Sequence, residues 1–486
     1  MLLAAKPRVW QEVPGVGEIR TWPKEVGADY LIGRTGKDSE RVAALALSEA
    51  LGGLPLAHEQ AGAYCERLGI SLGEYHRRFR ATPTHILDTS RDAPETYFDR
   101  LTVAKTFALA IEAAAKFHPA AEPLIVRASM LAPEPIPLFL FAEARDKFGE
   151  PLASDLAGDG LDEAVAALRH FALVDREVVV DEHEPTISTD TIRLHRLVRE
   201  VAAARREGRD REAIWRGLLD AVLSAYPEHA EDDPASWPRA RRLDAIGLGL
   251  VADRLATSGD VEVWISSLLV RLARFRYGVL ASYDQARPLL ERALAIIEKR
   301  LGPDHTDTAT CLNDLGMLLN SRGDRAGARP LFERALAINE KQLGPDHPDT
   351  AQSLNNLAGL LEAQGDRAGA RQLYERALAI LEKHLGPEHP NIASALTNLA
   401  SLLEAQNDRA SARALYERAL AIYERQLGPD HPATALSLGN LALLLASSNK
   451  VRARAMLNRA LAIGLRQLGP RHPHTIKIRK DLASIR

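Results

Sequence analysis

The sequence has few of the residues that build disulfide frameworks, metal centres or membrane spans. Its 486 residues include two cysteines, Cys65 and Cys311, which lie far apart and belong to no Cys-x-x-Cys or Cys/His cluster. This excludes a disulfide framework and a structural zinc site. No apolar run reaches the length of a membrane helix, and the first residues contain no signal-peptide core. We therefore expect a soluble cytoplasmic protein without membrane contact.

Aromatic residues and net charge are also scarce. Aromatics make up 5% of the chain, and 62 Lys+Arg nearly balance 65 Asp+Glu, leaving a formal net charge of -3. Because strands favour aromatic and β-branched residues, whereas the abundant Ala, Leu, Arg and Glu favour helices, the composition predicts a mostly all-α chain. The balanced charge excludes a bulk field that draws the whole protein onto nucleic acid or an anionic membrane.

A nine-residue signal recurs five times in the C-terminal half, with spacings of 42, 42, 42 and 41 residues. Its copies, LGPDHTDTA and close variants, begin at Leu301, Leu343, Leu385, Leu427 and Leu468. Two amphipathic helical patterns lie between successive copies, joined by a turn such as Gly365-Asp366 and ended by a pair such as Gly386-Pro387. Because one hairpin cannot bury its apolar face alone, the period predicts a stacked α-solenoid of five hairpins plus a terminal helix.

These hairpins, with LNNLAGLL, GDRAGARQLYERALAI and LGPxHP, resemble the tetratricopeptide repeat in its 42-residue, kinesin-light-chain-like form. The resemblance begins at about Ser266 and assigns residues 261–486 to the solenoid. It implies that the protein binds a protein or peptide in a concave groove lined by the first helix of each hairpin.

Recurring polar residues in the first helices are the candidate groove residues. They are Asn313, Asp314, Asn355, Asn356, Asn398 and Asn440. Asn is a poor helix former, so its recurrence in mid-helix needs a reason other than helix propensity. Its amide both donates and accepts hydrogen bonds, which suits the backbone of an extended peptide. The alternative is that these side chains tie adjacent loops together or are merely solvated.

Histidines also recur at this period. They are His305, His347, His389, His431 and His472. Each belongs to a separate turn between hairpins, so their rings cannot converge on one ion. We expect them to form local hydrogen bonds, and we expect no metal site.

The N-terminal half resembles part of the NB-ARC/STAND type of signalling NTPase. Gly53–Ala57 matches the GLPLA element, and Leu194–Val198 stands in the place of the MHD motif, with Leu194 and Arg196 departing from its consensus. The resemblance implies a helical remnant over residues 1–90, a winged-helix domain over 91–205 and a helical linker over 206–260. In that domain, Val178–Val180 and Thr186–Leu194 would form the wing.

The same resemblance implies that Pro55 would lie against an adenine and His195 against a diphosphate, but only if a nucleotide binds. A GxxxxGK[ST] phosphate loop is absent, and Gly33–Asp38, the nearest string, has the wrong spacing. Pro55 and His195 are therefore interpreted as vestigial sensors. ADP or ATP would bind only with a P-loop domain supplied in trans or by an upstream start. No nucleophile elbow, HExxH or Cys-x-x-Cys offers other chemistry, so we expect no enzyme and no cofactor.

Two functions follow from these features. The first is a protein-binding scaffold or sensor of the NB-ARC/STAND type that lacks its own NTPase core. The alternative is a winged-helix transcriptional regulator, because Arg196–Arg216 could contact DNA phosphates. The candidate recognition helix LDEAVAALRHF contains acidic residues, which makes DNA the less expected partner. Val451–Arg486 carries nine Arg or Lys against one acid, Asp481, and is expected to steer acidic partners.

The missing phosphate loop generates a first prediction. We expect no measurable ATP hydrolysis, because the backbone amides and the lysine that hold phosphate charge are not encoded. Calorimetric titration of the chain with ADP and magnesium should show weak binding at most. Micromolar affinity for ADP, or turnover of ATP, would contradict this prediction.

Overall fold

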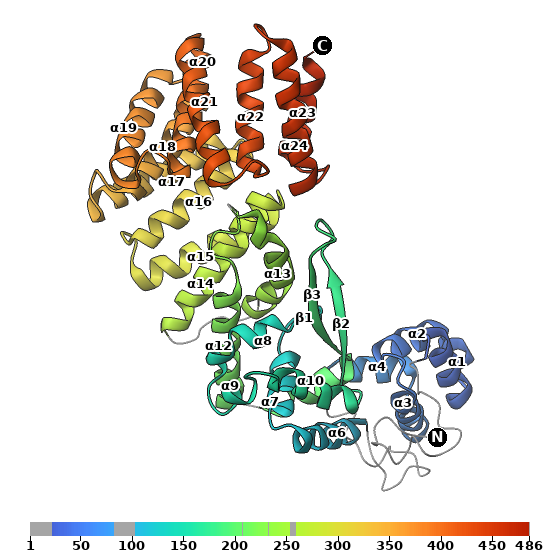
Figure 1. The fold of residues 1–486 in the computed structure, drawn as a ribbon. Coiled ribbons are helices and arrows are strands. Elements are labelled where there is room, and N and C mark those ends of the chain that lie inside the picture. Colours follow the sequence, from blue (N-terminus) through green and yellow to red (C-terminus); the bar gives the residue numbers. More distant parts are fainter. Residues whose placement is uncertain (1–21, 82–102, 207, 232, 253–258, 486) are drawn as a thin grey trace. The chain divides into compact units, whose positions relative to one another are not determined.

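The computed structural model describes residues 22–81, 103–206, 208–231, 233–252 and 259–485. These residues are mostly helical, as predicted, and contain a three-stranded sheet (Figure 1). The chain forms two compact units. The first comprises Met1–Asp181, Thr186–Ala225 and Ala245–Asp253, and the second comprises Glu182–Pro185, Tyr226–Asp244 and Arg254–Arg486. The finer division into four segments stays a prediction.

A cluster of short helices opens the first unit. Its helices are α1 (Lys24–Thr35), α2 (Arg41–Ala50), α3 (Pro55–Leu68) and α4 (Leu72–Ala81). Ser48 and His58 are fully buried between α2 and α3, and Ser48 Oγ lies 2.9 Å from His58 Nε2. Burial lowers the pKa of His58, so the ring contributes to the core as a neutral group. The two helices are thus tied by a satisfied polar pair inside an apolar core.

Among the described residues, the rest of the first unit combines seven α-helices with a small antiparallel sheet. Its helices are α6 (Val103–Phe117), α7 (Ala121–Ser129), α8 (Phe139–Glu143), α9 (Leu152–Asp155), α10 (Gly160–His170), α11 (Arg196–Ala203) and α12 (Gly208–Ala225). The strands β1 (Ile136–Pro137), β2 (Val174–Val180) and β3 (Ser188–Leu194) have the order β1-β3-β2. The predicted hairpin is confirmed, with Val174 opposite Leu194 and Val180 opposite Ser188. Helix α13 (Trp237–Val251) contributes residues to both units.

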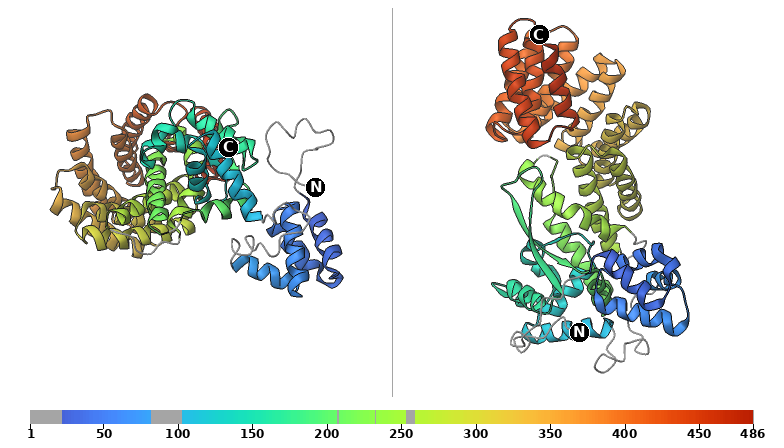
Figure 2. Two further views of the ribbon diagram at one scale, coloured as in Figure 1. Left: turned by 90° about the horizontal axis from the view of Figure 1, so that it is seen from below. Right: turned by 90° about the vertical axis from the view of Figure 1, so that its right-hand side faces the viewer.

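The second unit contains the predicted hairpins and terminal helix. The hairpins are α14 (Gly259–Arg274) with α15 (Tyr283–Leu301), α16 (Thr306–Ser321) with α17 (Arg325–Gln342), α18 (Pro348–Gln364) with α19 (Arg367–Leu385), α20 (Pro390–Ala405) with α21 (Arg409–Gln426), and α22 (Pro432–Leu445) with α23 (Lys450–Gln467). Helix α24 (Pro473–Ser484) follows (Figures 1 and 2). Each helix packs against the next one along the chain, so the prediction of five hairpins plus a terminal helix is confirmed.

Small and large side chains alternate in the solenoid core. Ala358, Ala370 and Ala377 are fully buried, and the ring of Tyr374 fills the space between helices. The turn between α18 and α19 uses Gly365 in the left-handed conformation (φ 92°), which favours glycine. The alanines let the helices approach closely. The larger ring of Tyr374 fills the remaining space between the helices, so the core is densely packed.

A ladder of ion pairs joins each second helix to the second helix before it. Its members are Arg334–Glu298, Arg376–Glu340, Arg418–Glu382 and Arg459–Glu424, at N–O distances of 2.6, 2.8, 2.8 and 2.6 Å. Exposed pairs of this kind contribute about 0 to 1 kcal/mol each. Their repetition at one position defines the register between hairpins more than it adds stability.

The repeated histidines begin the first helices. Nδ1 of His305, His347, His389, His431 and His472 accepts a hydrogen bond from the backbone N–H two residues later, at 3.1 to 3.2 Å. Each ring therefore caps a helix N-terminus, which confirms the predicted local bonding. Among the described residues, no group of three or more His, Cys, Asp or Glu side chains is placed to hold a metal ion.

The caps generate a second prediction. His347→Ala should lower the free energy of unfolding by about 1 kcal/mol, because the Asp349 N–H loses its acceptor. His347→Asn should restore most of this loss, since Asn is a favoured capping residue. Urea denaturation followed by circular dichroism measures both. Equal stability of the two variants would show that the ring does not act as a cap.

Candidate functional site

The first helices form the more closely packed side of the solenoid. Helix α16 contacts α18, α18 contacts α20, and α20 contacts α22 directly. In the described part of the chain, consecutive second helices do not contact one another as extensively as these first helices do. Helices on the inside of a curved stack approach one another, so the first helices line the inner face.

Four predicted groove residues lie on this inner face at intermediate exposure: Asn355, Asn356, Asn398 and Asn440. Asn398 Nδ2 donates to Asn355 Oδ1 of the preceding first helix at 3.1 Å. Asn356 Oδ1 accepts from Gln352 Nε2 at 3.1 Å, while Asn356 Nδ2 is buried without an acceptor. Asn440 forms no hydrogen bond within the described residues. The structure thus brings Asn355 and Asn398 together and leaves Asn356 Nδ2 and the Asn440 amide without a hydrogen-bond partner among the described residues.

Asn313 and Asp314 lie deeper than their counterparts, at 8% and 6% exposure. Asn313 Nδ2 donates to Ser353 Oγ at 2.9 Å. Asp314 accepts from Arg274 Nε at 2.9 Å and from the Tyr277 hydroxyl at 3.2 Å. Their bonds join hairpins to one another, so the open part of the predicted row begins at Asn355. Contact with a ligand stays a prediction for the whole row.

The Asp314 ion pair is the most buried charged contact of the inner face. Burial raises the pKa of Asp314, and the positive charge of Arg274 opposes this shift. Glu231 lies 3.7 Å from Arg274 and adds a second negative charge. Because the guanidinium is itself largely buried, the pair fixes the divergent first hairpin against the second.

In each of two hairpins, a tyrosine of the second helix is hydrogen-bonded to a glutamate of the first helix. The Tyr374 hydroxyl donates to Glu362 at 3.1 Å, and the Tyr416 hydroxyl donates to Glu404 at 3.3 Å. Burial raises the pKa of Glu362. The sequence interpretation missed these pairs, although both members recur at the 42-residue spacing.

The N-terminal candidates meet at one turn of the first unit. His195 Nδ1 accepts from the Leu197 N–H at 3.2 Å. A neutral ring therefore carries its proton on Nε2, which donates to the Gly52 carbonyl at 3.0 Å. Gly52 has φ 64°, and a Cβ there would lie 2.3 Å from His195 Nε2. Pro55 begins α3 three residues later. Their role as nucleotide sensors stays a prediction.

Arginines of the predicted DNA-contacting segment bond internally. Arg199 donates to the Ala128 and Ser129 carbonyls at 3.1 and 3.2 Å. Arg205 pairs with Glu122 at 3.0 Å, and Arg216 with Glu212 at 3.4 Å. These guanidinium groups stabilise the first unit, which reduces the charge that remains for phosphate contact.

The basic C-terminal segment is paired in part. Arg459 and Arg466 bind Glu424 and Asp430 at 2.6 and 2.7 Å. The other described cations of the segment are exposed and make no ion pair with described residues: Arg452, Arg454, Arg471, Lys477, Arg479 and Lys480. Arg486 lies outside the described residues. The free positive charge is therefore concentrated on α23, α24 and their turn.

The second unit is an α-solenoid of stacked helical hairpins. Its hairpins are tetratricopeptide repeats: the family model with that description matches residues 264–341, 315–383, 370–425 and 391–464. Tetratricopeptide repeats generally form scaffolds for contacts between proteins. Within the described residues, no helix is long and apolar enough to cross a membrane.

Solved structures with similar repeats include a putative kinesin light chain. The crystal structure of its nearly identical TPR-like repeats, from Podosopora anserina, shows 29% identity over 42% of this chain and 97% of that chain, with a TM-score of 0.33. BtubC (BKLC) from P. vanneervenii shows 22% identity over 52% of this chain and 94% of that chain, with a TM-score of 0.35. No curated protein matches the chain.

The buried ion pair generates a third prediction. Asp314→Asn should lower the free energy of unfolding by about 3 kcal/mol, because it leaves Arg274 buried with only the more distant Glu231 for compensation. Asp307→Asn, an exposed change in the same helix, is the control and should have a small effect. Chemical denaturation measures both. A variant at position 314 as stable as the control would exclude a structural role for the pair.

Proposed function

We propose that this chain is a protein-binding scaffold whose solenoid binds an extended peptide or protein segment along its inner face. The observation that carries this proposal is the unsatisfied amide chemistry of that face. Asn356 Nδ2, Asn313 Oδ1 and Ser437 Oγ are buried without a hydrogen-bond partner among the described residues. Native proteins leave few such groups unpaired, because each costs about 1 to 3 kcal/mol.

An extended backbone supplies what these groups lack. Its N–H and C=O groups alternate, so one strand offers an acceptor to Asn356 Nδ2 and both kinds of partner to Asn440. Apolar residues border the amides, since Leu436 and Leu443 are half-exposed in α22. The inner face therefore presents amides for a backbone and, towards its C-terminal end, apolar contacts for side chains.

The first unit is proposed to be the remnant of an NB-ARC/STAND module with a winged helix. The Gly52 turn, Pro55 at the start of α3, and the His195 contact support this assignment. The β1-β3-β2 sheet with its hairpin is a further observation in support of the proposal. In this proposal the unit either relays the binding of a ligand by the scaffold or anchors the scaffold, in a cytoplasmic signalling protein. The chain does not catalyse a reaction, and nucleotide binds only with a P-loop domain in trans.

The internal bonds of Arg199 and Arg205 support protein binding over the alternative of DNA binding. A regulator that used this segment on DNA would need those guanidinium groups at its surface.

The groove generates a fourth prediction. Peptides are selected from a random displayed library on the immobilised full-length chain, and their affinity is measured by fluorescence anisotropy. The double change Asn356→Ala and Asn440→Ala should weaken binding by about tenfold or more, because each lost amide bond contributes about 1 kcal/mol. The melting temperature should stay close to that of the unchanged chain, since alanine is the better helix former.

A matched control places the same number of changes on the second helices. Arg371 and Arg413 are exposed and form ion pairs within their own helices, with Glu375 and Glu417. Arg371→Ala with Arg413→Ala should leave peptide affinity unchanged. Equal loss in both double variants, or retained affinity in the asparagine variant, would refute binding at the inner face.

A further inference from the structure

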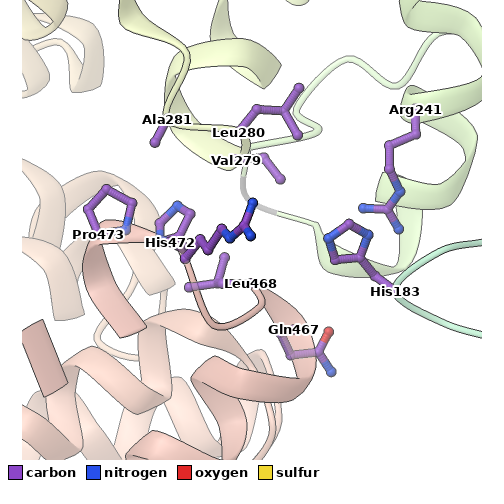
Figure 3. Close-up of a pocket in the computed structure, with 10 residues that line it drawn as sticks. His183, Arg241, Val279, Leu280, Ala281, Gln467, Leu468, His472 and Pro473 are labelled. Atoms are coloured by element: carbon purple, nitrogen blue, oxygen red, sulfur yellow. The ribbon is translucent and has the colours of Figure 1, made fainter. Parts of the chain in front are cut away.

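A small cavity in the second unit is lined by nitrogen-bearing side chains and by no acidic residue. Its volume is about 180 Å³. The residues that line it are His183, Arg241, Val279, Leu280, Ala281, Gln467, Leu468, Arg471, His472 and Pro473 (Figure 3). The α23–α24 turn and the N-terminus of α24 form one wall, and the segment Val279–Ala281 forms another.

His472 supplies a buried donor without an acceptor. Its side chain caps α24, because Nδ1 accepts from the His474 N–H at 3.2 Å. The proton of a neutral ring therefore lies on Nε2. That atom is buried and forms no hydrogen bond with a described residue, and the whole residue is 8% exposed.

The ring stays neutral at physiological pH. Burial and the neighbouring His474 lower the pKa of His472 to about 4. The Gly278 carbonyl lies near enough to oppose this shift, but it does not meet hydrogen-bond geometry with Nε2. His472, which lines the cavity, thus carries its proton on Nε2 without an acceptor that meets hydrogen-bond geometry among the described residues.

The charge of the turn is reversed at this hairpin alone. In the four preceding turns, the residue before the repeated histidine is Asp304, Asp346, Glu388 or Asp430. Each of these carboxylates pairs with a Lys or Arg of the next second helix: Lys341, Lys383, Arg425 or Arg466. The fifth turn has Arg471 at that position. Arg471 makes no ion pair within the described residues, so it adds uncompensated positive charge to the cavity.

We propose that this cavity is a binding site for a phosphate-type oxyanion, held by the guanidinium groups of Arg471 and Arg241 and by the Nε2–H of His472. The N-terminus of the twelve-residue helix α24 adds the positive end of its dipole. Guanidinium groups suit this ligand because they donate several hydrogen bonds in one plane. This site is independent of the inner-face amides and goes beyond the proposed peptide binding.

Two sources provide this chemistry, namely free inorganic phosphate and a phosphomonoester such as phosphoserine. Isothermal titration of the full-length chain with sodium phosphate and with phosphoserine distinguishes them, with sodium chloride at matched ionic strength as the reference. Binding of both anions identifies a site open to phosphorylated groups. Binding of phosphate alone identifies a site for the free anion. Binding of neither overturns the proposal.

Two variants test the residues. Arg471→Gln should weaken phosphate binding by about tenfold or more, because it removes a charge-assisted hydrogen bond. His472→Asn should weaken it by about five- to tenfold, because Asn retains the helix cap but lacks the Nε2 donor. Circular dichroism melting checks that both variants fold.

The matched controls carry the same changes outside the cavity. Arg454→Gln removes another exposed and unpaired cation of α23, and His389→Asn changes the equivalent cap of α20. Both should bind phosphate as the unchanged chain does. If Arg454→Gln weakens binding as much as Arg471→Gln, the effect is one of general charge and the proposed site is wrong. If His472→Asn binds phosphate as tightly as the unchanged chain, the Nε2–H of His472 does not contact the anion and its proposed role is wrong.

Discussion

The structure of the second unit depends on one constraint: a single helical hairpin cannot bury its apolar face without a neighbour. Fully buried alanines such as Ala370 and Ala377 set how closely the helices approach. This spacing in turn places Tyr374 between helices and Arg376 opposite Glu340 of the preceding hairpin. The ion-pair ladder is therefore a consequence of stacking and could not form in an isolated hairpin.

Stacking also gives the two sides of the solenoid different chemistry. The outer helices satisfy their charges with one another, at the position where Arg376 meets Glu340. On the inner face two described amide pairs form, Asn398 with Asn355 and Gln352 with Asn356, and Asn356 Nδ2 remains buried without an acceptor. An outer surface that is satisfied internally offers little to a partner, whereas unsatisfied inner groups gain free energy when a ligand supplies their bonds.

The periodic features could be predicted from the sequence because each one repeats a local pattern. The hairpins, the turn at Gly365 and the local hydrogen bonding of His347 all follow from spacing and residue type, whereas the capping role of His347 is seen only in the structure. The burial of Asp314 could not be predicted, because its partner Arg274 belongs to a divergent first hairpin that breaks the period. The bond from His195 to Gly52 joins residues 143 positions apart, and no local pattern encodes such a contact. The sequence contains strings that resemble the GLPLA and MHD motifs, but it does not show that these two segments lie close together in the fold.

The fifth hairpin departs from the residue pattern of the ion-pair ladder. Leu465 stands where the earlier second helices have a glutamate such as Glu424, and Arg471 stands where the earlier turns have an acid such as Asp430. The fifth hairpin therefore lacks both the glutamate and the turn acid that would accept cations of a following hairpin. Leu465, at the glutamate position, is 41% exposed. A further hairpin of the same pattern would place its cation against Arg471. Like charges at ion-pair distance repel, and these two substitutions leave the positive charge of Arg471 without an ion-pair partner among the described residues. The basic C-terminal segment and the cavity without acidic residues thus both result from the same departures from the repeat pattern.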